Sequence, residues 1–325
     1  MRVAVVGCGT MGKSHIENLA AMPGVELVAI CDNNEIEVNK TAEHWQIRAY
    51  VSLDEMINME NPDVVSICLP TYLHKEYVLR VAAYGKHIIC EKPIAPSIED
   101  AIEMINTCKE KGVRLFVGHV VRFFPSYADI KAKVDAGVIG KVGVIHTKRI
   151  GSNPARARAW YKDRSGGVII DLMIHDIDFL CSVMGEVASV YALQTQSEQN
   201  DYALVTLRFA GGAIANLEAH WGYPGPFTTA VEFAGTEGVI RFNSEDALSL
   251  KIVKTATPED NQTAAVAIPQ SPAFHNPYYY ELKHFLACIE NDTESIVTAT
   301  DALRALKIAL AAAQSAQTGM KIDIH

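Results

Sequence analysis

The sequence predicts an α/β protein of two domains, with a doubly wound parallel sheet in residues 1–120 and an α+β domain with a large, predominantly antiparallel open sheet in residues 121–325. Three observations support this fold class. Short apolar runs alternate with helical patterns in the first third of the chain, a glycine-rich turn follows the first run, and later runs are separated mostly by turns. At 325 residues, the chain also exceeds the usual size of one hydrophobic core.

The overall composition is typical of a soluble globular protein, with 49% apolar and 21% charged residues. The net charge of −9 disfavours binding to nucleic acid or to an anionic membrane, and no apolar run is long enough to cross a bilayer. The chain enters a strand at once, so we expect no signal peptide. Its seven cysteines are scattered and form no Cys-x-x-Cys pair, which predicts reduced thiols in a cytoplasmic protein and no metal site.

The first apolar run, Arg2–Val6, leads into a Gly-x-Gly-x-x-Gly motif and then into a helical pattern that extends to Ala21. This context of strand, glycine turn and helix is typical of a Rossmann dinucleotide-binding domain. The first glycine permits the tight turn, the second lets a pyrophosphate approach the backbone, and the third lets the helix pack closely. Backbone N–H groups at the start of the helix would face the phosphates. The motif residues that we expect to contact the cofactor are Gly7, Cys8, Gly9, Thr10, Met11 and Gly12.

The second apolar run, Val25–Cys31, is followed directly by Asp32. A carboxylate at this distance from the glycines accepts a hydrogen bond from the ribose 2′-OH and would repel a 2′-phosphate. Asn33 and Asn34 come next, with no arginine or lysine to bind a phosphate. The sequence therefore favours NAD over NADP, with Asp32 and Asn33 beside the cofactor. The alternative is that Asp32 caps a helix that begins near Glu35.

Further apolar runs and helical patterns continue to about residue 120. The expected helices cover about 35–43, 53–59, 73–84 and 97–111, and the expected strands cover 64–69, 88–90 and 113–118. Such alternation produces right-handed βαβ units. Leu69, Pro70 and Thr71 end one of these strands and are expected to flank the cofactor, with His74 in the next helical turn. A solvated or capping histidine is an equal alternative for His74.

The apolar run Ile88–Cys90 ends in Glu91, Lys92 and Pro93. The run has no polar alternation, which indicates an inner strand of a parallel sheet. Because proline cannot continue the ladder, Glu91 and Lys92 are expected at the carboxyl edge of the sheet, where open α/β sheets bind ligands. Lys92 is thus a candidate proton donor or charge stabiliser, and Glu91 a candidate neighbour of the cofactor. A strand that simply ends in solvated charges is the alternative.

The second half contains a helical pattern, Val168–Met184, that follows a Gly-Gly pair. Asp171, His175 and Asp178 are spaced so that they share one face of this helix, and the other faces are apolar. A buried histidine beside an aspartate is the arrangement of an oriented general base. An ordinary surface pair of residues four positions apart is the alternative.

Strand patterns dominate the chain from there to about residue 253. Together with an earlier run, the expected strands cover 142–150, 187–194, 203–209, 213–219, 229–234, 238–242 and 247–252. Without helices between most of them, they should form a mostly antiparallel sheet, whose exposed face is a candidate subunit interface. A polar loop is expected over 255–271, followed by helices over 277–290 and 298–318.

Taken together, these motifs resemble the glucose–fructose oxidoreductase / inositol dehydrogenase / rhizopine catabolism (Gfo/Idh/MocA) family over essentially the whole chain. The resemblance implies an N-terminal Rossmann domain and a C-terminal α/β domain with a large open sheet. It also implies NAD-dependent hydride transfer to or from a sugar or cyclitol hydroxyl, as in myo-inositol 2-dehydrogenase, and homodimers or homotetramers that form through the sheet. The motifs that carry it are the glycine turn, Leu69-Pro70-Thr71, Glu91-Lys92-Pro93, and Gly166-Gly167 followed by Asp171 and His175.

The same resemblance implies the roles of individual residues. Lys92 matches the catalytic lysine of the family, and Asp171 and His175 match the residues that complete its site. In the implied mechanism His175 takes the proton of the substrate hydroxyl, Asp171 orients the imidazole, and Lys92 stabilises the developing alkoxide. Glu91 and Pro93 match residues that shape the cofactor site.

Other functions on the same fold remain open. They are an NADP-linked reductase of a sugar or nucleotide-sugar, a glycosidase that uses NAD transiently, and a non-catalytic nucleotide-binding regulator. Asp32 disfavours the first, and a pure regulator has no need of Lys92 and His175. The candidates for contact with a polyol or sugar substrate are Arg122, Arg156, Trp160 and Trp221. Arginines within 151–164 would favour an acidic sugar if they reach the site, but they could equally bind a partner subunit.

Overall fold

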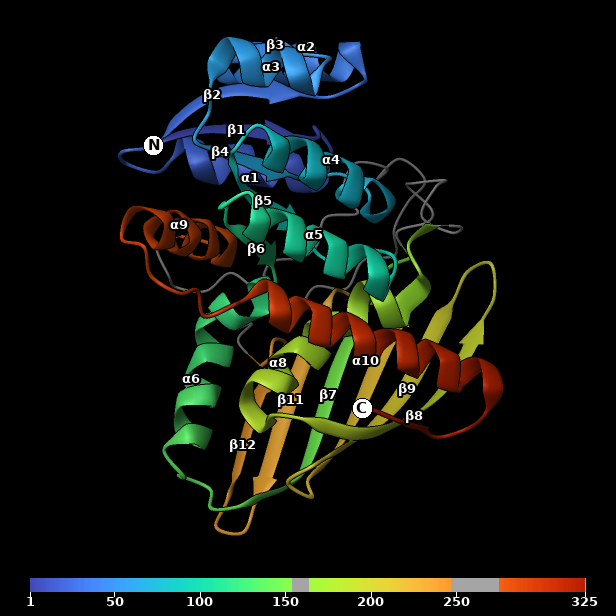
Figure 1. Ribbon diagram of the computed structural model, residues 1–325. Coiled ribbons are helices and arrows are strands. Elements are labelled where there is room, and N and C mark those ends of the chain that lie inside the picture. The colour runs from blue at the N-terminus through green and yellow to red at the C-terminus, as the bar shows by residue number, and fades with distance from the viewer. Residues whose placement is uncertain (154–163, 247–274, 325) are drawn as a thin grey trace. The chain divides into compact units, whose positions relative to one another are not determined.

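A computed structural model describes residues 1–153, 164–246 and 275–324 of the chain (Figure 1). The described residues form two compact units. The first contains Met1–Phe123, helix α9 (Pro277–Glu290) and the beginning of helix α10 (Ala299–Thr318), and the second contains the other described residues. The strand expected over 247–252 and the polar loop expected over 255–271 lie outside the described residues.

The first unit is built on a parallel sheet with the strand order β3-β2-β1-β4-β5-β6. Every strand pair described in this sheet is parallel, and the order turns back at β1, as in a Rossmann dinucleotide-binding fold. The prediction of a doubly wound parallel sheet is therefore confirmed. The strands are β1 (Arg2–Val6), β2 (Glu26–Cys31), β3 (Arg48–Tyr50), β4 (Val64–Ile67), β5 (His87–Glu91) and β6 (Leu115–Gly118).

Helices connect successive strands of this sheet close to the expected bounds. They are α1 (Thr10–Ala20), α2 (Glu35–Trp45), α3 (Leu53–Glu60), α4 (Thr71–Ala83) and α5 (Ile98–Glu110). The three helices that follow β2, β3 and β5 begin with the same kind of side-chain cap. The N-cap residues Asn34, Ser52 and Ser97 each accept a hydrogen bond from the backbone N–H three residues later, which fixes where α2, α3 and α5 begin. The edge strand β3 was not expected, because none of its residues is fully buried.

Helix α9 completes the core of the first unit, although it lies far along the chain. Phe285 stacks on Phe116 of β6, with ring centroids 4.9 Å apart. Leu282 and Leu286 belong to the same buried cluster as Leu19 of α1. We expected a single domain boundary near residue 120. That prediction assigned α9 to the second domain, because it considered only the order of the sequence.

The second unit is built on a sheet with the strand order β12-β11-β7-β10-β9-β8-β13. The neighbours β7 and β10 are parallel, and the other described pairs are antiparallel. The prediction of a predominantly antiparallel sheet is confirmed, with this one pair as the exception among the described strands. The strands are β7 (Val142–Gly151), β8 (Val187–Gln196), β9 (Asp201–Phe209), β10 (Ile214–Trp221), β11 (Thr228–Gly235), β12 (Val239–Asn243) and β13 (Ile322–Asp323).

The two faces of this sheet differ in exposure. Along β9, Ala203 and Val205 are buried, whereas Leu204 between them is exposed. Helices α8 (Ile174–Met184) and α10 lie across one face (Figure 1). The Ser315 hydroxyl of α10 accepts the backbone N–H of Ala192 in β8 at 3.0 Å, which ties this helix to the sheet.

Helix α6 (Pro125–Asp135) follows the short turn η1 (Val120–Phe123) and was not expected. Only Tyr127 and Ile130 of α6 are buried, so its apolar spacing is too sparse to predict a helix. None of the described helices is both long and apolar enough to span a bilayer. Nor does any group of three or more His, Cys, Asp or Glu side chains in the described ranges have the arrangement of a metal site.

Candidate active site

The glycine motif lies between β1 and α1, and its glycines meet different constraints. Gly7 has a φ of +100°, and a Cβ there would lie 2.5 Å from the carbonyl oxygen of Cys68. A Cβ on Gly12 would lie 1.7 Å from the carbonyl oxygen of Gly7. At Gly9, by contrast, an added Cβ would have no described atom within 4 Å beyond its chain neighbours, and α1 begins at the next residue, Thr10. An open backbone at the N-terminus of a helix fits the pyrophosphate of a dinucleotide.

Asp32 follows β2, and its carboxylate is fixed beside the glycine turn. Oδ2 accepts the backbone N–H of Cys8 at 2.7 Å, and Oδ1 accepts the backbone N–H of Asn34 at 2.9 Å. Asn34 is the N-cap of α2, because its side chain accepts the N–H of Glu37. The alternative that Asp32 caps this helix is therefore wrong. The next residue, Asn33, is exposed.

His74, in the first turn of α4, is completely buried. Nε2 lies 2.8 Å from the carbonyl oxygen of Leu69, and Nδ1 lies 2.9 Å from that of Pro93. Burial lowers the pKa of His74, although the two carbonyls and the charge of Glu91 act in the opposite direction. The solvated alternative is wrong, because the ring ties Leu69-Pro70-Thr71 to the segment after β5. This role also differs from the direct cofactor contact that we expected, since both ring nitrogens face backbone carbonyls.

The end of β5 places Lys92 and Glu91 in different environments. Lys92 is partly exposed and is joined to Pro93 by a cis peptide bond. Glu91 is buried, and its Oε2 accepts the backbone N–H of Lys92 at 3.1 Å. A Cβ on Gly118 would lie 3.3 Å from Glu91 Oε1, so this carboxylate points into the protein. Glu91 therefore supports the backbone of Lys92 from inside, rather than facing the cofactor or the solvent as we had considered.

His15 of α1 is a further residue of this region, and the sequence patterns did not lead us to it. Its side chain is 0% exposed. Nδ1 lies 2.7 Å from Ser66 Oγ, and Nε2 lies 3.1 Å from Glu91 Oε1. A signal was present, because His15 is spaced with Gly12 and Leu19 on the inner face of the helix.

The surroundings of His15 and Glu91 favour the charged form of both side chains. Burial alone lowers the pKa of His15, but the Cys68 sulfur and the Glu91 carboxylate raise it overall, well above its usual range. Burial alone likewise raises the pKa of Glu91, but the hydrogen bond and charge of His15, with the charge of Lys92, lower it overall. Both shifts favour a protonated imidazole beside an ionised carboxylate.

The helical segment that we expected over 168–184 is present in the second unit, but its first turn is wider than an α-helical turn. A π-helical turn, Ile169–Met173, precedes α8. Asp171 lies in the π turn, His175 is the second residue of α8, and both are partly buried. Asp178, which we expected on the same stripe, is completely buried. Single π turns within helices occur frequently at functional sites.

Two contacts with the sheet hold this helical segment. Asp201 of β9 accepts the backbone N–H of Val168 at 2.9 Å. Gly167, with a φ of +77°, leaves room for it, because a Cβ there would lie 3.0 Å from the same carboxylate oxygen. Arg149 of β7 donates through Nε and Nη2 to the two carboxylate oxygens of Asp176, at 2.8 and 2.9 Å. The segment with the candidate general base is therefore anchored on both sides of the π turn.

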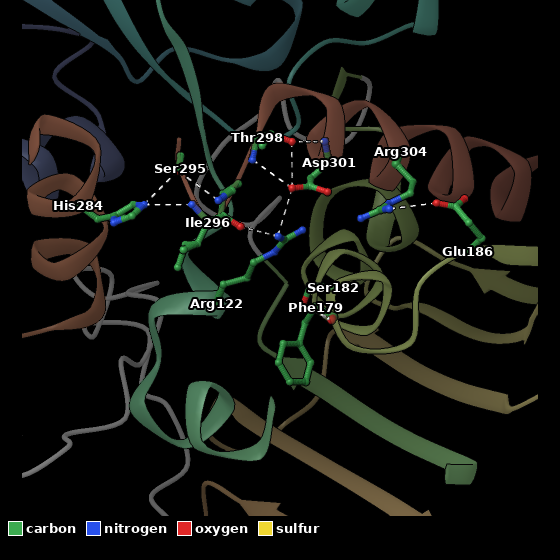
Figure 2. Close-up of polar contacts among 11 residues, drawn as sticks. Arg122, Phe179, Ser182, Glu186, His284, Ser295, Ile296, Thr298, Asp301 and Arg304 are labelled. Carbon is green, nitrogen blue, oxygen red and sulfur yellow. Dashed lines mark hydrogen bonds and ion pairs between the residues drawn. The ribbon is translucent and has the colours of Figure 1, made fainter. Parts of the chain in front are cut away.

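The structure describes two of the four residues that we expected to contact the substrate. Arg122 is 9% exposed and donates to the Ile296 carbonyl (2.8 Å) and to Asp301 Oδ2 (3.3 Å), as Figure 2 shows. It therefore joins η1 to the start of α10, which differs from the substrate contact that we expected. Trp221, at the end of β10, is also mostly buried, with its ring 6.5 Å from that of Phe227 between centroids. The other two candidates, Arg156 and Trp160, lie outside the described residues.

Comparison with known proteins assigns the chain to a family. Residues 1–119 match the model of the Gfo/Idh/MocA oxidoreductase family with its NAD-binding Rossmann fold, and residues 131–324 match the model of the C-terminal alpha/beta domain of that family. The chain belongs to this family. The resemblance inferred from the motifs is thus confirmed, and the protein is a Gfo/Idh/MocA oxidoreductase.

Individual relatives are similar over the whole length of this oxidoreductase. It is 33% identical over 341 residues to scyllo-inositol 2-dehydrogenase (NAD(+)) of Bacillus subtilis (strain 168), covering 100% of this chain and 96% of that protein. It is 31% identical over 340 residues to myo-inositol 2-dehydrogenase of Thermotoga maritima, covering 100% and 99%. The solved structure of a myo-inositol dehydrogenase from Corynebacterium glutamicum ATCC 13032 is similar with a TM-score of 0.84 at 26% identity, covering 100% of this chain and 99% of that one.

Proposed function

We propose that this Gfo/Idh/MocA oxidoreductase transfers a hydride between NAD and a hydroxyl carbon of a cyclitol or sugar, in the manner of an inositol 2-dehydrogenase. The observation that carries the proposal is the place of Lys92, directly after β5, at the same carboxyl edge of the parallel sheet as Gly9 and Asp32. Ligands of open α/β sheets bind at that edge. The inositol dehydrogenases among the relatives support a cyclitol as the substrate.

The proposed cofactor is NAD rather than NADP. The Asp32 carboxylate accepts two backbone N–H groups, so it cannot turn away without losing both hydrogen bonds. A carboxylate held in this way accepts the ribose 2′-OH and repels a 2′-phosphate. When bound, the nicotinamide supplies the acceptor for the hydride of the carbinol carbon.

The proposed catalytic residues are Lys92, His175 and Asp171. His175 takes the proton of the substrate hydroxyl as a general base, and Asp171 favours the charged imidazole that results. Lys92 stabilises the negative charge that develops on the substrate oxygen, which is an electrostatic contribution of preorganised groups. In the direction of reduction, the His175 imidazolium returns the proton to the oxygen.

We also propose that the enzyme is a cytoplasmic homodimer or homotetramer that associates through the exposed face of the second sheet. Val144, Leu193, Leu204 and Ile214 are exposed large apolar residues of β7, β8, β9 and β10. The strand register puts Leu193 opposite Leu204 and Val144 opposite Ile214. Exposed apolar patches of this kind are typical of association surfaces. The cysteines are all free and buried, which fits a reducing compartment.

The experiment that tests the proposed function is a substrate screen. NADH or NADPH formation is followed at mildly alkaline pH with each cofactor, across a panel of inositols, aldoses and uronic acids. We expect turnover of an inositol or a neutral sugar with NAD. Turnover only with NADP would contradict the role of Asp32. NAD binding without turnover of any member of the panel would contradict the proposed substrate class and favour a nucleotide-binding regulator.

A further inference from the structure

A hydrogen-bonded chain inside the first unit joins α1 to the residue that follows β5. His15 of α1 contacts Ser66 Oγ through Nδ1 (2.7 Å) and Glu91 Oε1 through Nε2 (3.1 Å). The other carboxylate oxygen of Glu91 accepts the backbone N–H of Lys92 (3.1 Å). Because His15 and Glu91 are buried, water does not compete for these bonds. The chain leads from the helix that starts at the glycine turn to the backbone of Lys92.

The groups around His15 favour its doubly protonated form. The buried Glu91 carboxylate requires a counter-charge, and an imidazolium supplies it through Nε2–H. Nδ1–H then donates to the serine hydroxyl, which has Cys68 Sγ 3.7 Å away as its next partner. Tyr278 faces the imidazole from α9, with ring centroids 6.4 Å apart, and the Lys92 ammonium is the further charge that acts on Glu91. These surroundings raise the pKa of His15.

We propose that His15, as an imidazolium, is a positioning residue for Lys92. Its ion pair with Glu91 holds the end of β5 against α1, and this sets the place of the Lys92 ammonium relative to the glycine turn. The imidazolium also balances the charge of Glu91, so that the carboxylate does not take Lys92 as its own counter-ion. His15 is fully enclosed and acts only through Glu91. The proposal rests on the proposed catalytic role of Lys92.

Two substitutions of His15 separate its hydrogen bond from its charge. His15→Leu removes both, whereas His15→Gln keeps a neutral donor toward Glu91. Because a misplacement of about 1 Å can cost on the order of a hundredfold in rate, we expect kcat to fall by about ten- to a hundredfold in His15→Leu and by less in His15→Gln. NAD affinity depends on the glycine turn and Asp32, and it should be nearly unchanged. Adding Glu91→Gln to His15→Leu removes the unpaired charge and should restore part of kcat.

Glu60 offers a matched control in the same unit. It is a buried carboxylate on α3, and its partners are Arg48 (2.8 Å), Arg2 (3.7 Å) and the hydroxyl of Tyr50. Glu60→Gln therefore perturbs a buried carboxylate and its ion pairs with partly exposed arginines, in a different cluster from Lys92. We expect both kcat and NAD affinity of this variant to match those of the unsubstituted protein.

The first test measures kcat with myo-inositol and scyllo-inositol, and NAD affinity by calorimetry, for all these variants. A fall of kcat in His15→Leu, with NAD affinity retained and Glu60→Gln unaffected, supports the positioning role. An unchanged kcat would overturn it. A parallel loss of NAD affinity, or an equal loss of kcat in the control, would also overturn it, because His15 would then support only the fold.

The second test does not depend on turnover, so it separates this proposal from the proposed function. Lys92 is acetylated with acetic anhydride over a range of pH, and the extent is read by mass spectrometry with the other lysines as standards. We expect His15→Leu to move the midpoint of Lys92 acetylation to higher pH, because the unbalanced Glu91 charge favours the ammonium, and Glu60→Gln to leave it in place. An unmoved midpoint overturns the positioning role. A moved midpoint in a protein that turns over no inositol overturns only the proposed function.

Discussion

The guanidinium of Arg149 and the carboxylate of Asp176 form a two-point ion pair, with distances of 2.8 Å from Nε to Oδ2 and 2.9 Å from Nη2 to Oδ1. Both side chains are almost completely removed from water. Arg149 comes from β7, and Asp176 follows His175 directly in α8. The pair therefore fixes the start of α8 on the sheet, and with it the backbone of the proposed general base.

This geometry predicts a large effect on stability when one partner is removed. Arg149→Met leaves the Asp176 carboxylate buried without its counter-charge, so we expect the free energy of unfolding to fall by about 3–5 kcal/mol in urea denaturation. The double variant Arg149→Met with Asp176→Leu removes both charges and should recover most of this loss. Arg241→Met, which breaks an exposed pair with Glu232, should cost less than about 1 kcal/mol. A double variant no more stable than the single one would contradict this account.

The glycine turn predicts different effects on the melting temperature for substitutions at two of its residues. At Gly9 a methyl group meets open space, so Gly9→Ala should keep the melting temperature and lose NAD affinity, because the methyl occupies the approach of the pyrophosphate. At Gly12 a methyl group would lie 1.7 Å from a carbonyl oxygen, so Gly12→Ala should lower the melting temperature as well. Thermal unfolding and NAD titration of both variants check this. Retained NAD affinity in Gly9→Ala would refute the assignment of the pyrophosphate site.

The fixed carboxylate at the end of β2 predicts a change in cofactor preference. Asp32→Ala removes the acceptor for the ribose 2′-OH and the charge that repels a 2′-phosphate. We expect the ratio of kcat/KM for NADP to that for NAD to rise by at least about tenfold, which corresponds to about 1.4 kcal/mol. Steady-state kinetics with each cofactor measure it. An unchanged ratio would mean that another group selects the cofactor.

The ion pair of His15 and Glu91 predicts how stability depends on pH. The lowered pKa of Glu91 gives a stabilisation that is present above its ordinary value of 4.5 and is lost as the pH falls through the folded pKa. The raised pKa of His15 gives a second stabilisation, which is present below the ordinary value of 6.5 and is lost as the pH rises through the folded pKa. The stability difference between the protein and the double variant His15→Gln with Glu91→Gln should therefore be largest between these two values and decline on either side. Urea denaturation from below pH 4.5 to well above pH 6.5 measures the difference, and a flat profile across this whole span would count against the ion pair.

Much of the first unit followed from the sequence, because its signals are local. The buried run before Lys92 and the glycine turn after β1 can each be predicted from a pattern of only a few residues. The return of α9 to this unit was not predictable in the same way. Phe285 and Phe116 are far apart in the sequence, and their stacking depends on tertiary packing alone.

The residue types of the candidate site could be predicted from the sequence, but the directions of their side chains could not. Lys92 and Asp32 lie at the sheet edge where the patterns placed them. Glu91 and Arg122 are also charged, but they point into the protein toward structural partners. A buried charge is stable only beside a group that pairs with it. The sequence shows which groups are present, whereas the partner of each emerges only when distant segments meet, as His15 and Glu91 do.

The most direct test of the central claim compares two lysines that flank the same strand. Lys92→Met removes the proposed catalytic ammonium just after β5, and Lys86→Met removes a partly exposed lysine just before it, whose Nζ donates to Asn61. With NAD and the inositol that the screen identifies, kcat/KM should fall by about a hundred- to a thousandfold in Lys92→Met, with NAD affinity retained, and should not change in Lys86→Met. Turnover by Lys92→Met at the level of the unsubstituted enzyme would contradict the account.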